Sequence, residues 1–133
     1  MSEQTNIQTI QALYEAFGQG DLPTILEGVT DDVDWRASGP QEIPYAGNWR
    51  GRDRVAQFFA AVARTLEHET FEPQEFIAQG DKVVVTGDEH VRVKSTGKTL
   101  DNPWVMVFTL REGKIAGFRL YEDTAVLVAA LQS

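Results

Sequence analysis

The chain has 133 residues and carries 20 acidic against 12 basic side chains, which gives a formal net charge of −8. This length fits one domain with its own hydrophobic core, and the negative charge opposes binding to nucleic acid or to an anionic membrane surface. Because the chain contains no cysteine, disulfides, thiolate nucleophiles and cysteine metal sites are excluded. We therefore expect residues 1–133 to form a single domain.

The N-terminal half predicts helices around one strand and one long loop. Residues 1–6 lack the basic and apolar regions of a secretion signal, and no later apolar run is long enough to span a bilayer, which predicts a cytoplasmic protein. Apolar residues at helical spacing predict helices over residues 5–17 and 53–66, with a short helix between them. A strand is expected over residues 33–37. Residues 38–51 are too rich in Gly and Pro for regular structure, so we expect a functional loop or lid there.

The C-terminal half predicts a β-meander. Apolar and polar residues alternate from Asp81 to Asp123, with interruptions at the turns 95–98 and 112–113. Turns this short leave no room for a crossover helix, so neighbouring strands must pair antiparallel. A further strand is expected over residues 71–78, and a short helix follows Thr124. The order of the elements predicts an α+β fold, with an antiparallel sheet and helices gathered on one side of it.

Three segments carry a resemblance to a known superfamily: Tyr14–Asp21, Gly51–Val55 and Glu112–Ile115. From about residue 7 to residue 131 the chain resembles the NTF2-like superfamily, and within it the SnoaL-like and ketosteroid-isomerase-related branch. The resemblance implies a cone-shaped fold, in which three helices of the N-terminal half cover a bent antiparallel or mixed sheet and a short helix ends the chain. It also implies an apolar pocket and a homodimer. Members of the superfamily differ in activity, so the resemblance does not select a function.

The alignment implies that the catalytic groups of three known mechanisms of this superfamily are missing. Ketosteroid isomerase needs a carboxylate base, a tyrosine and a protonated acid, and these positions fall near Ala37, Leu13 and Trp104. The catalytic positions of limonene-epoxide hydrolase lack the required groups. In this chain they are occupied by His90, Arg92, Leu120, Trp35 and Ala37. The position of the catalytic acid of the SnoaL cyclases also falls near Leu120, so this acid is absent as well. We therefore expect none of these three mechanisms to operate.

The residues left at these positions form the predicted site. Strand parity places Asp88, His90 and Arg92 on one face, which we expect to line the pocket. His90 is the candidate general base, and Arg92 is the candidate group that stabilises an oxyanion. The candidate ligand contacts are Trp35, Tyr45, Trp49, Asp88, Trp104 and Leu120. His68 lies between two glutamates and is interpreted as a solvated loop residue, while Glu89 is expected on the outer face near Arg119.

Two classes of function stay open. The first is an isomerase, dehydratase or cyclase that acts by proton transfer on a small hydrophobic carbonyl compound. The alternative is a non-catalytic hydrophobic-ligand-binding or dimerisation module, in which His90 is an ordinary surface residue. In both interpretations the partners are a small hydrophobic molecule and a second copy of the chain, without nucleic acid or membrane. No cofactor and no metal site are expected, because the sequence contains none of the usual spacings for them.

Overall fold

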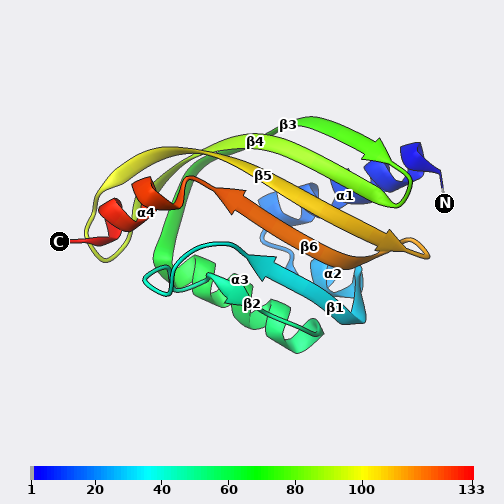
Figure 1. Ribbon diagram of the computed structural model, residues 1–133, viewed down its shortest axis with the longest axis horizontal. Coiled ribbons are helices and arrows are strands. Elements are labelled where there is room, and N and C mark those ends of the chain that lie inside the picture. Colours follow the sequence, from blue (N-terminus) through cyan, green and yellow to red (C-terminus); the bar gives the residue numbers. More distant parts are fainter. Residues whose placement is uncertain (1) are drawn as a thin grey trace.

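Residues 2–133, which the computed structural model describes, form four helices and six strands (Figure 1). The elements follow the predicted order, and one of the six strands, the short β2, was not predicted. The helices are α1 (Glu3–Gly18), α2 (Leu22–Glu27), α3 (Arg52–Thr65) and α4 (Thr124–Leu131). The strands are β1 (Val29–Ala37), β2 (Gly47–Asn48), β3 (Leu66–Gln79), β4 (Lys82–Val93), β5 (Thr99–Arg111) and β6 (Lys114–Glu122). α2 and α4 begin where the carboxylates of Asp21 and Asp123 accept backbone N–H groups.

The strands form one mixed sheet in the order β2-β1-β6-β5-β4-β3. The four strands from β3 to β6 are the predicted antiparallel meander. β1 instead pairs parallel with β6, so that Trp35 lies opposite Phe118. Parallel pairing needs a long connection, and here the connection contains α3 and the first three strands of the meander. The predicted α+β class is confirmed.

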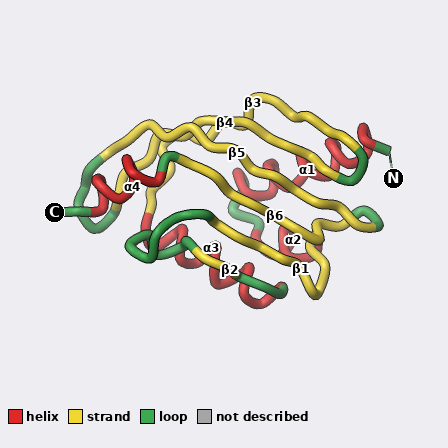
Figure 2. The backbone as a smooth tube through the Cα atoms, viewed as in Figure 1, coloured by secondary structure: helices red, strands yellow, loops and turns green. Residues whose placement is uncertain are grey.

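The sheet is bent, and α1, α2 and α3 lie against one face of it (Figures 1 and 2). We call this the inner face, and the opposite one the outer face. Because successive side chains of a strand point to opposite faces, β4 buries alternate valines at its inner face: Val83, Val85, Val91 and Val93. On the outer face Ile77 and Tyr121 remain exposed. Among residues 2–133, no helix combines the length and the apolar character needed to cross a bilayer.

β3 begins earlier than the sequence predicts. α3 ends at Thr65, and the next residue, Leu66, already has extended backbone and pairs with Val93 of β4. His68 therefore lies within a strand, and its interpretation as a loop residue is wrong. The pairing register of β3 shifts between His68 and Thr70 and again between Pro73 and Glu75. These two bulges interrupt the alternation of apolar and polar residues, which hides the strand from a pattern of period two.

The segment 38–51 is mostly irregular, as predicted, but it is packed against the core. Ile43 and Tyr45 are 1% and 2% exposed. The short strand β2 pairs with the end of β1, and the Trp49 N–H donates to the Trp35 carbonyl oxygen at 2.7 Å. These contacts hold Tyr45 at the inner face, where it becomes part of the site described below.

Candidate functional site

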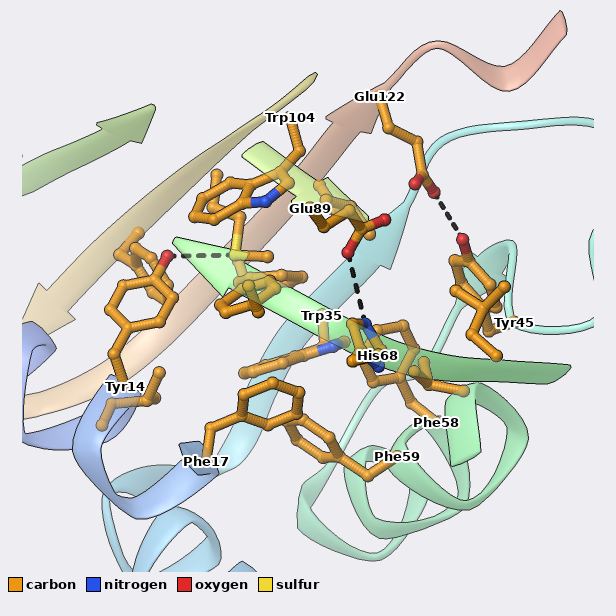
Figure 3. Close-up of a pocket in the computed structure, with 18 residues that line it drawn as sticks. Tyr14, Phe17, Trp35, Tyr45, Phe58, Phe59, His68, Glu89, Trp104 and Glu122 are labelled. Carbon is orange, nitrogen blue, oxygen red and sulfur yellow. Dashed lines mark hydrogen bonds and ion pairs between the residues drawn. The ribbon is translucent and has the colours of Figure 1, made fainter. Parts of the chain in front are cut away.

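A cavity of about 70 Å³ lies between the inner face of the sheet and helices α1 and α3 (Figure 3). Aromatic side chains make most of its wall: Tyr14, Phe17, Trp35, Phe58, Phe59, Phe71, Trp104, Phe108 and Phe118. Several of these rings stack face to face, with centroids 3.9 Å apart for Trp35 and Phe118 and 4.8 Å apart for Phe71 and Trp104. A wall of this kind favours an apolar and flat ligand.

A histidine and a glutamate face each other in this wall. Nε2 of His68 on β3 lies 3.2 Å from Oε1 of Glu89 on β4, and Glu89 is 7% exposed. The rings of Phe17 and Phe71 lie nearly perpendicular to the imidazole, each with its centroid 5.8 Å away. A carboxylate this close to one ring nitrogen favours one orientation of the imidazole, and the side chain of His68 remains 22% exposed. The arrangement has the parts of a general acid–base catalyst.

A second carboxylate, Glu122 at the end of β6, lies on another side of the cavity. Its Oε2 accepts a hydrogen bond from the Tyr45 hydroxyl at 2.8 Å, and its Oε1 accepts one from Nδ2 of Asn102 at 3.2 Å. Burial raises the pKa of Glu122 to about 7; the Tyr45 hydrogen bond opposes this shift, and the charge of Glu89 adds to it. Burial, together with Glu122, also raises the pKa of Tyr45. Glu122 can therefore exchange a proton near neutral pH.

Tyr14 on α1 contributes a hydroxyl to the cavity. The hydroxyl donates to Sδ of Met106 at 3.1 Å, and the ring stacks on Trp104 with centroids 5.9 Å apart. Burial raises the pKa of Tyr14, so the group stays neutral. The alignment placed the tyrosine position of ketosteroid isomerase at Leu13, one residue away. In the structure both Leu13 and Tyr14 line the cavity, so a tyrosine hydroxyl is present that the alignment did not assign to the site.

The predicted ligand contacts separate into two groups. Trp35, Tyr45, Trp104 and Leu120 line the cavity, and their contact with a ligand stays a prediction. Trp49 lies outside its wall: the indole N–H donates to the Tyr45 carbonyl oxygen at 2.9 Å. Trp49 therefore supports the loop that carries Tyr45.

The structure places Asp88, His90 and Arg92 on the outer face, so the prediction that they line the pocket is wrong. They do share a face, as parity requires, but the buried valines of β4 occupy the opposite one. Nδ1 of His90 lies 2.6 Å from Oδ1 of Asp101, and Arg92 pairs with Glu67 at 3.2 Å. The pairing of β4 with β5 is regular through Gly87, so no bulge changes the parity.

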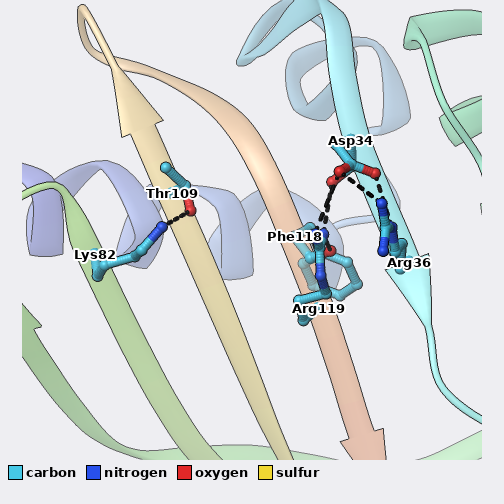
Figure 4. A network of polar contacts seen from close by, with 6 residues as sticks. All are labelled: Asp34, Arg36, Lys82, Thr109, Phe118 and Arg119. Atoms are coloured by element: carbon cyan, nitrogen blue, oxygen red, sulfur yellow. Dashed lines mark hydrogen bonds and ion pairs between the residues drawn. The ribbon is translucent and has the colours of Figure 1, made fainter.

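Sequence reasoning missed four polar residues of this site: Tyr14, His68, Glu89 and Glu122. Glu89 has the same parity as the four buried valines of β4, and this signal could have identified its position. The prediction that Glu89 lies on the outer face near Arg119 is wrong: Arg119 does lie on that face, where it bonds Asp34 at 3.2 Å (Figure 4), but Glu89 lines the cavity on the inner face. His68 had no comparable signal, because the first bulge of β3 follows it directly. Within residues 2–133, no group of three or more acidic, histidine or cysteine side chains is arranged to hold a metal ion.

Comparisons with known proteins agree on one family. The family described as "SnoaL-like domain" matches residues 10–118. An NTF2-like protein from Burkholderia xenovorans is 36% identical, with 99% of each chain covered and a TM-score of 0.90. An NTF2-like protein of unknown function from Burkholderia pseudomallei is 31% identical, with 100% of each chain covered and a TM-score of 0.87.

A third solved structure is that of TerC, which was co-crystallised with polyporic acid. It is 32% identical, with 97% of this chain and 99% of that chain covered and a TM-score of 0.86. No curated protein matches the sequence.

Proposed function

The chain belongs to the SnoaL-like family of the NTF2-like superfamily, as its sequence predicted, and from this premise we propose that it binds a small hydrophobic carbonyl compound in the cavity and moves a proton to or from one of its carbon atoms. The observation that carries the proposal is the His68–Glu89 pair inside an aromatic wall. A family relationship alone would not suffice, because one fold supports many functions.

The two polar sides of the cavity have complementary tasks. His68, with Glu89 behind it, takes a proton from a carbon next to the carbonyl group, and the electron pair of the C–H bond moves to the carbonyl oxygen. The side chain of His68 is 22% exposed, so it can pass this proton to water. Glu122, whose pKa is raised to about 7 by burial, is partly protonated at neutral pH and can return a proton at another position. Such a sequence of steps is common to isomerases, dehydratases and cyclases.

The size of the cavity bears on how a ligand enters. At about 70 Å³ it is smaller than the cavity of roughly 150 Å³ that accommodates benzene in another protein. Phe17 and Phe59 are only partly buried, so they are the rings that we expect to move when a ligand binds. The crystallisation of TerC with polyporic acid supports an aromatic compound as the ligand.

Deuterium exchange tests the proposal without knowledge of the natural substrate. In D₂O, removal of a proton from 2-tetralone exchanges the hydrogens next to its carbonyl group, and NMR measures the rate. We expect the protein to accelerate this exchange, and His68→Gln or Glu89→Gln to slow it about a hundredfold or more. His90→Gln, on the outer face, is the matched control and should leave the rate unchanged.

The same experiment separates the two classes of function. An exchange rate equal to that of buffer, although 2-tetralone binds, would favour the non-catalytic ligand-binding alternative. Loss of exchange in His90→Gln with normal rates in His68→Gln would overturn the assignment of the base.

For the protein partner, we propose a homodimer formed through the outer face. Ile77 and Tyr121 are 55% and 47% exposed there, and Val105 lies directly opposite Tyr121 in the pairing of β5 with β6. Exposed apolar side chains on one sheet face favour an interface, and a second copy would bury the same patch on both subunits. Sedimentation velocity should show a dimer that Tyr121→Asp converts to a monomer, whereas Gln8→Asp on the exposed side of α1 should not. A monomeric wild type would overturn this proposal.

A further inference from the structure

We infer that the indole N–H groups of Trp35 and Trp104 bind oxygen atoms of the ligand, so that the cavity selects oxygenated aromatic compounds, such as aryl ketones and quinones, over aromatic hydrocarbons. This inference rests on the proposed function, because it names the substrate class for the same cavity. It adds to the site two N–H donors, which differ from the acid–base groups because they do not titrate.

The first observation is that both donors are buried without a partner. Trp35 and Trp104 are 1% and 3% exposed, and within residues 2–133 neither Nε1 has a hydrogen-bond partner. Burial of an unpaired donor costs about 1–3 kcal/mol, so a protein rarely keeps two of them in one place. The other polar groups of the wall differ: the hydroxyls of Tyr14 and Tyr45 donate to Met106 and Glu122.

The second observation is that both indole rings are held firmly. Trp35 stacks on Phe118 with an angle of 17° between the planes, and Trp104 stacks on Phe71 with an angle of 10°. Trp104 also lies directly over Gly87, where a Cβ atom would come within 2.2 Å of the indole. The absence of a side chain at this glycine leaves the space that the ring occupies. Donors fixed in this way need no reorganisation when charge develops on a ligand oxygen.

The third observation is the position of the donors relative to the acid–base groups. Figure 3 shows both indole nitrogens on the side of the cavity where His68 and Glu89 lie. When His68 removes a proton from carbon, the electron pair moves to the carbonyl oxygen, which then needs a donor. Glu89 cannot supply one as a carboxylate. An indole N–H can, and because it is donor-only and does not titrate, it serves a neutral carbonyl and an enolate equally.

The expected selectivity can be measured with two ligands of one carbon skeleton. 2-Tetralone carries a carbonyl oxygen and tetralin does not. A hydrogen bond from one indole N–H to the single carbonyl oxygen predicts that the wild type binds 2-tetralone about tenfold more tightly than tetralin. Trp35→Phe or Trp104→Phe, whichever removes this donor, should abolish the preference and leave the affinity for tetralin nearly unchanged. That substitution should also slow the deuterium exchange of 2-tetralone, by about a hundredfold.

NMR of the indole N–H groups tests the same contact in the unaltered protein, so it does not depend on how well the variants fold. The chain has three tryptophans, and Trp49 is an internal control because its N–H already donates to the Tyr45 carbonyl oxygen. On addition of 2-tetralone we expect a downfield proton shift for at least one of Trp35 and Trp104 but not for Trp49. Tetralin should produce no such downfield shift.

Equal affinities for the two ligands, or bound 2-tetralone without a shift of either indole, would overturn the inference. So would the failure of both ligands to bind, which would also remove the ligand class from the proposed function. Indole shifts without accelerated deuterium exchange would support the inference while overturning proton transfer. The two proposals can therefore fail separately.

Discussion

Each face of the sheet carries a histidine paired with a carboxylate, and the two pairs differ in their surroundings. On the inner face His68 and Glu89 lie 3.2 Å apart, with Glu89 7% exposed. On the outer face His90 and Asp101 are closer, at 2.6 Å, but the Asp101 side chain is 82% exposed. An exposed ion pair contributes little, because water and salt screen it. A short contact therefore does not identify a catalytic histidine–carboxylate pair. Burial of the pair within an aromatic cavity is the better reason to propose catalysis.

The largest difference between the faces is expected in packing. Phe108 and Val107 are neighbours on β5, but Phe108 is fully buried at the inner face and Val107 is partly exposed at the outer face. Phe108→Ala should lower the free energy of unfolding by about 3–5 kcal/mol, because it removes a large ring and leaves a void. Val107→Ala should cost less than about 1 kcal/mol. Urea denaturation of both variants measures the difference.

The Val107 variant also tests whether the outer face is covered. If Val107→Ala costs as much as a core substitution, and the loss depends on protein concentration, a second copy buries this side chain. A small loss at all concentrations, which we expect, would place Val107 outside the interface that we propose for the outer face.

The next effect is the pH dependence that Glu122 imposes on stability. Its pKa is raised from 4.5 to about 7 by burial, so the folded state holds the proton more tightly than the unfolded state. The stability contribution of this proton is therefore complete below pH 4.5 and is lost as pH rises to about 7. Glu122→Gln removes this dependence. The free energy of unfolding of the variant, relative to wild type, should rise by about 3 kcal/mol over that interval, measured by denaturation at several pH values.

Glu67 on the outer face is the matched control, because its pKa is lowered whereas that of Glu122 is raised. A hydrogen bond from Arg92, together with the charge of Arg92, lowers the pKa of Glu67. Its stability contribution is present above its ordinary pKa and is lost as pH falls. Glu67→Gln should therefore show a small change at acid pH only. A difference between Glu122→Gln and wild type that does not vary with pH would mean that the inner carboxyl is hydrated.

A substitution at Gly87 on β4 is expected to have a smaller effect on stability than the changes at Phe108 and Glu122. The nearest atom to a Cβ built there is Cζ2 of Trp104 at 2.2 Å, and the ring is stacked and cannot retreat freely. Gly87→Ala should cost about 1–3 kcal/mol through overpacking and should alter the indole signal of Trp104. Gly18→Ala is the control, because nothing lies within 4 Å of its Cβ position. Equal stability of the two variants would show that Trp104 has room to move.

The sequence predicted the order of the elements because helix periodicity, strand alternation and short turns are local signals. It also placed Trp35, Tyr45, Trp104 and Leu120 at the positions that now line the cavity. The choice of face for β4 was wrong, although the buried valines on the same parity as Glu89 contained the information. The position of His68 could not be predicted in this way. It depends on a strand that begins directly after a helix and on a bulge in its pairing with β4, and both are set by tertiary packing.

The smallest effect is expected for His90, and it completes the comparison of the two faces. The hydrogen bond with Asp101 raises the pKa of His90; desolvation opposes this shift, and the charges of Asp101 and Glu69 add to it. Its stability contribution is therefore present below the ordinary pKa of histidine and is lost as pH rises through the raised value.

His90→Gln should lower the melting temperature slightly at pH 5.5 and not at pH 9, and Asp101→Asn should reproduce this pattern. Deuterium exchange of 2-tetralone by His90→Gln should stay within about twofold of wild type, because the side chain is separated from the cavity by the sheet itself. A large loss of exchange in this variant would mean that the reaction takes place on the outer face, and that the aromatic cavity serves only to hold the fold together.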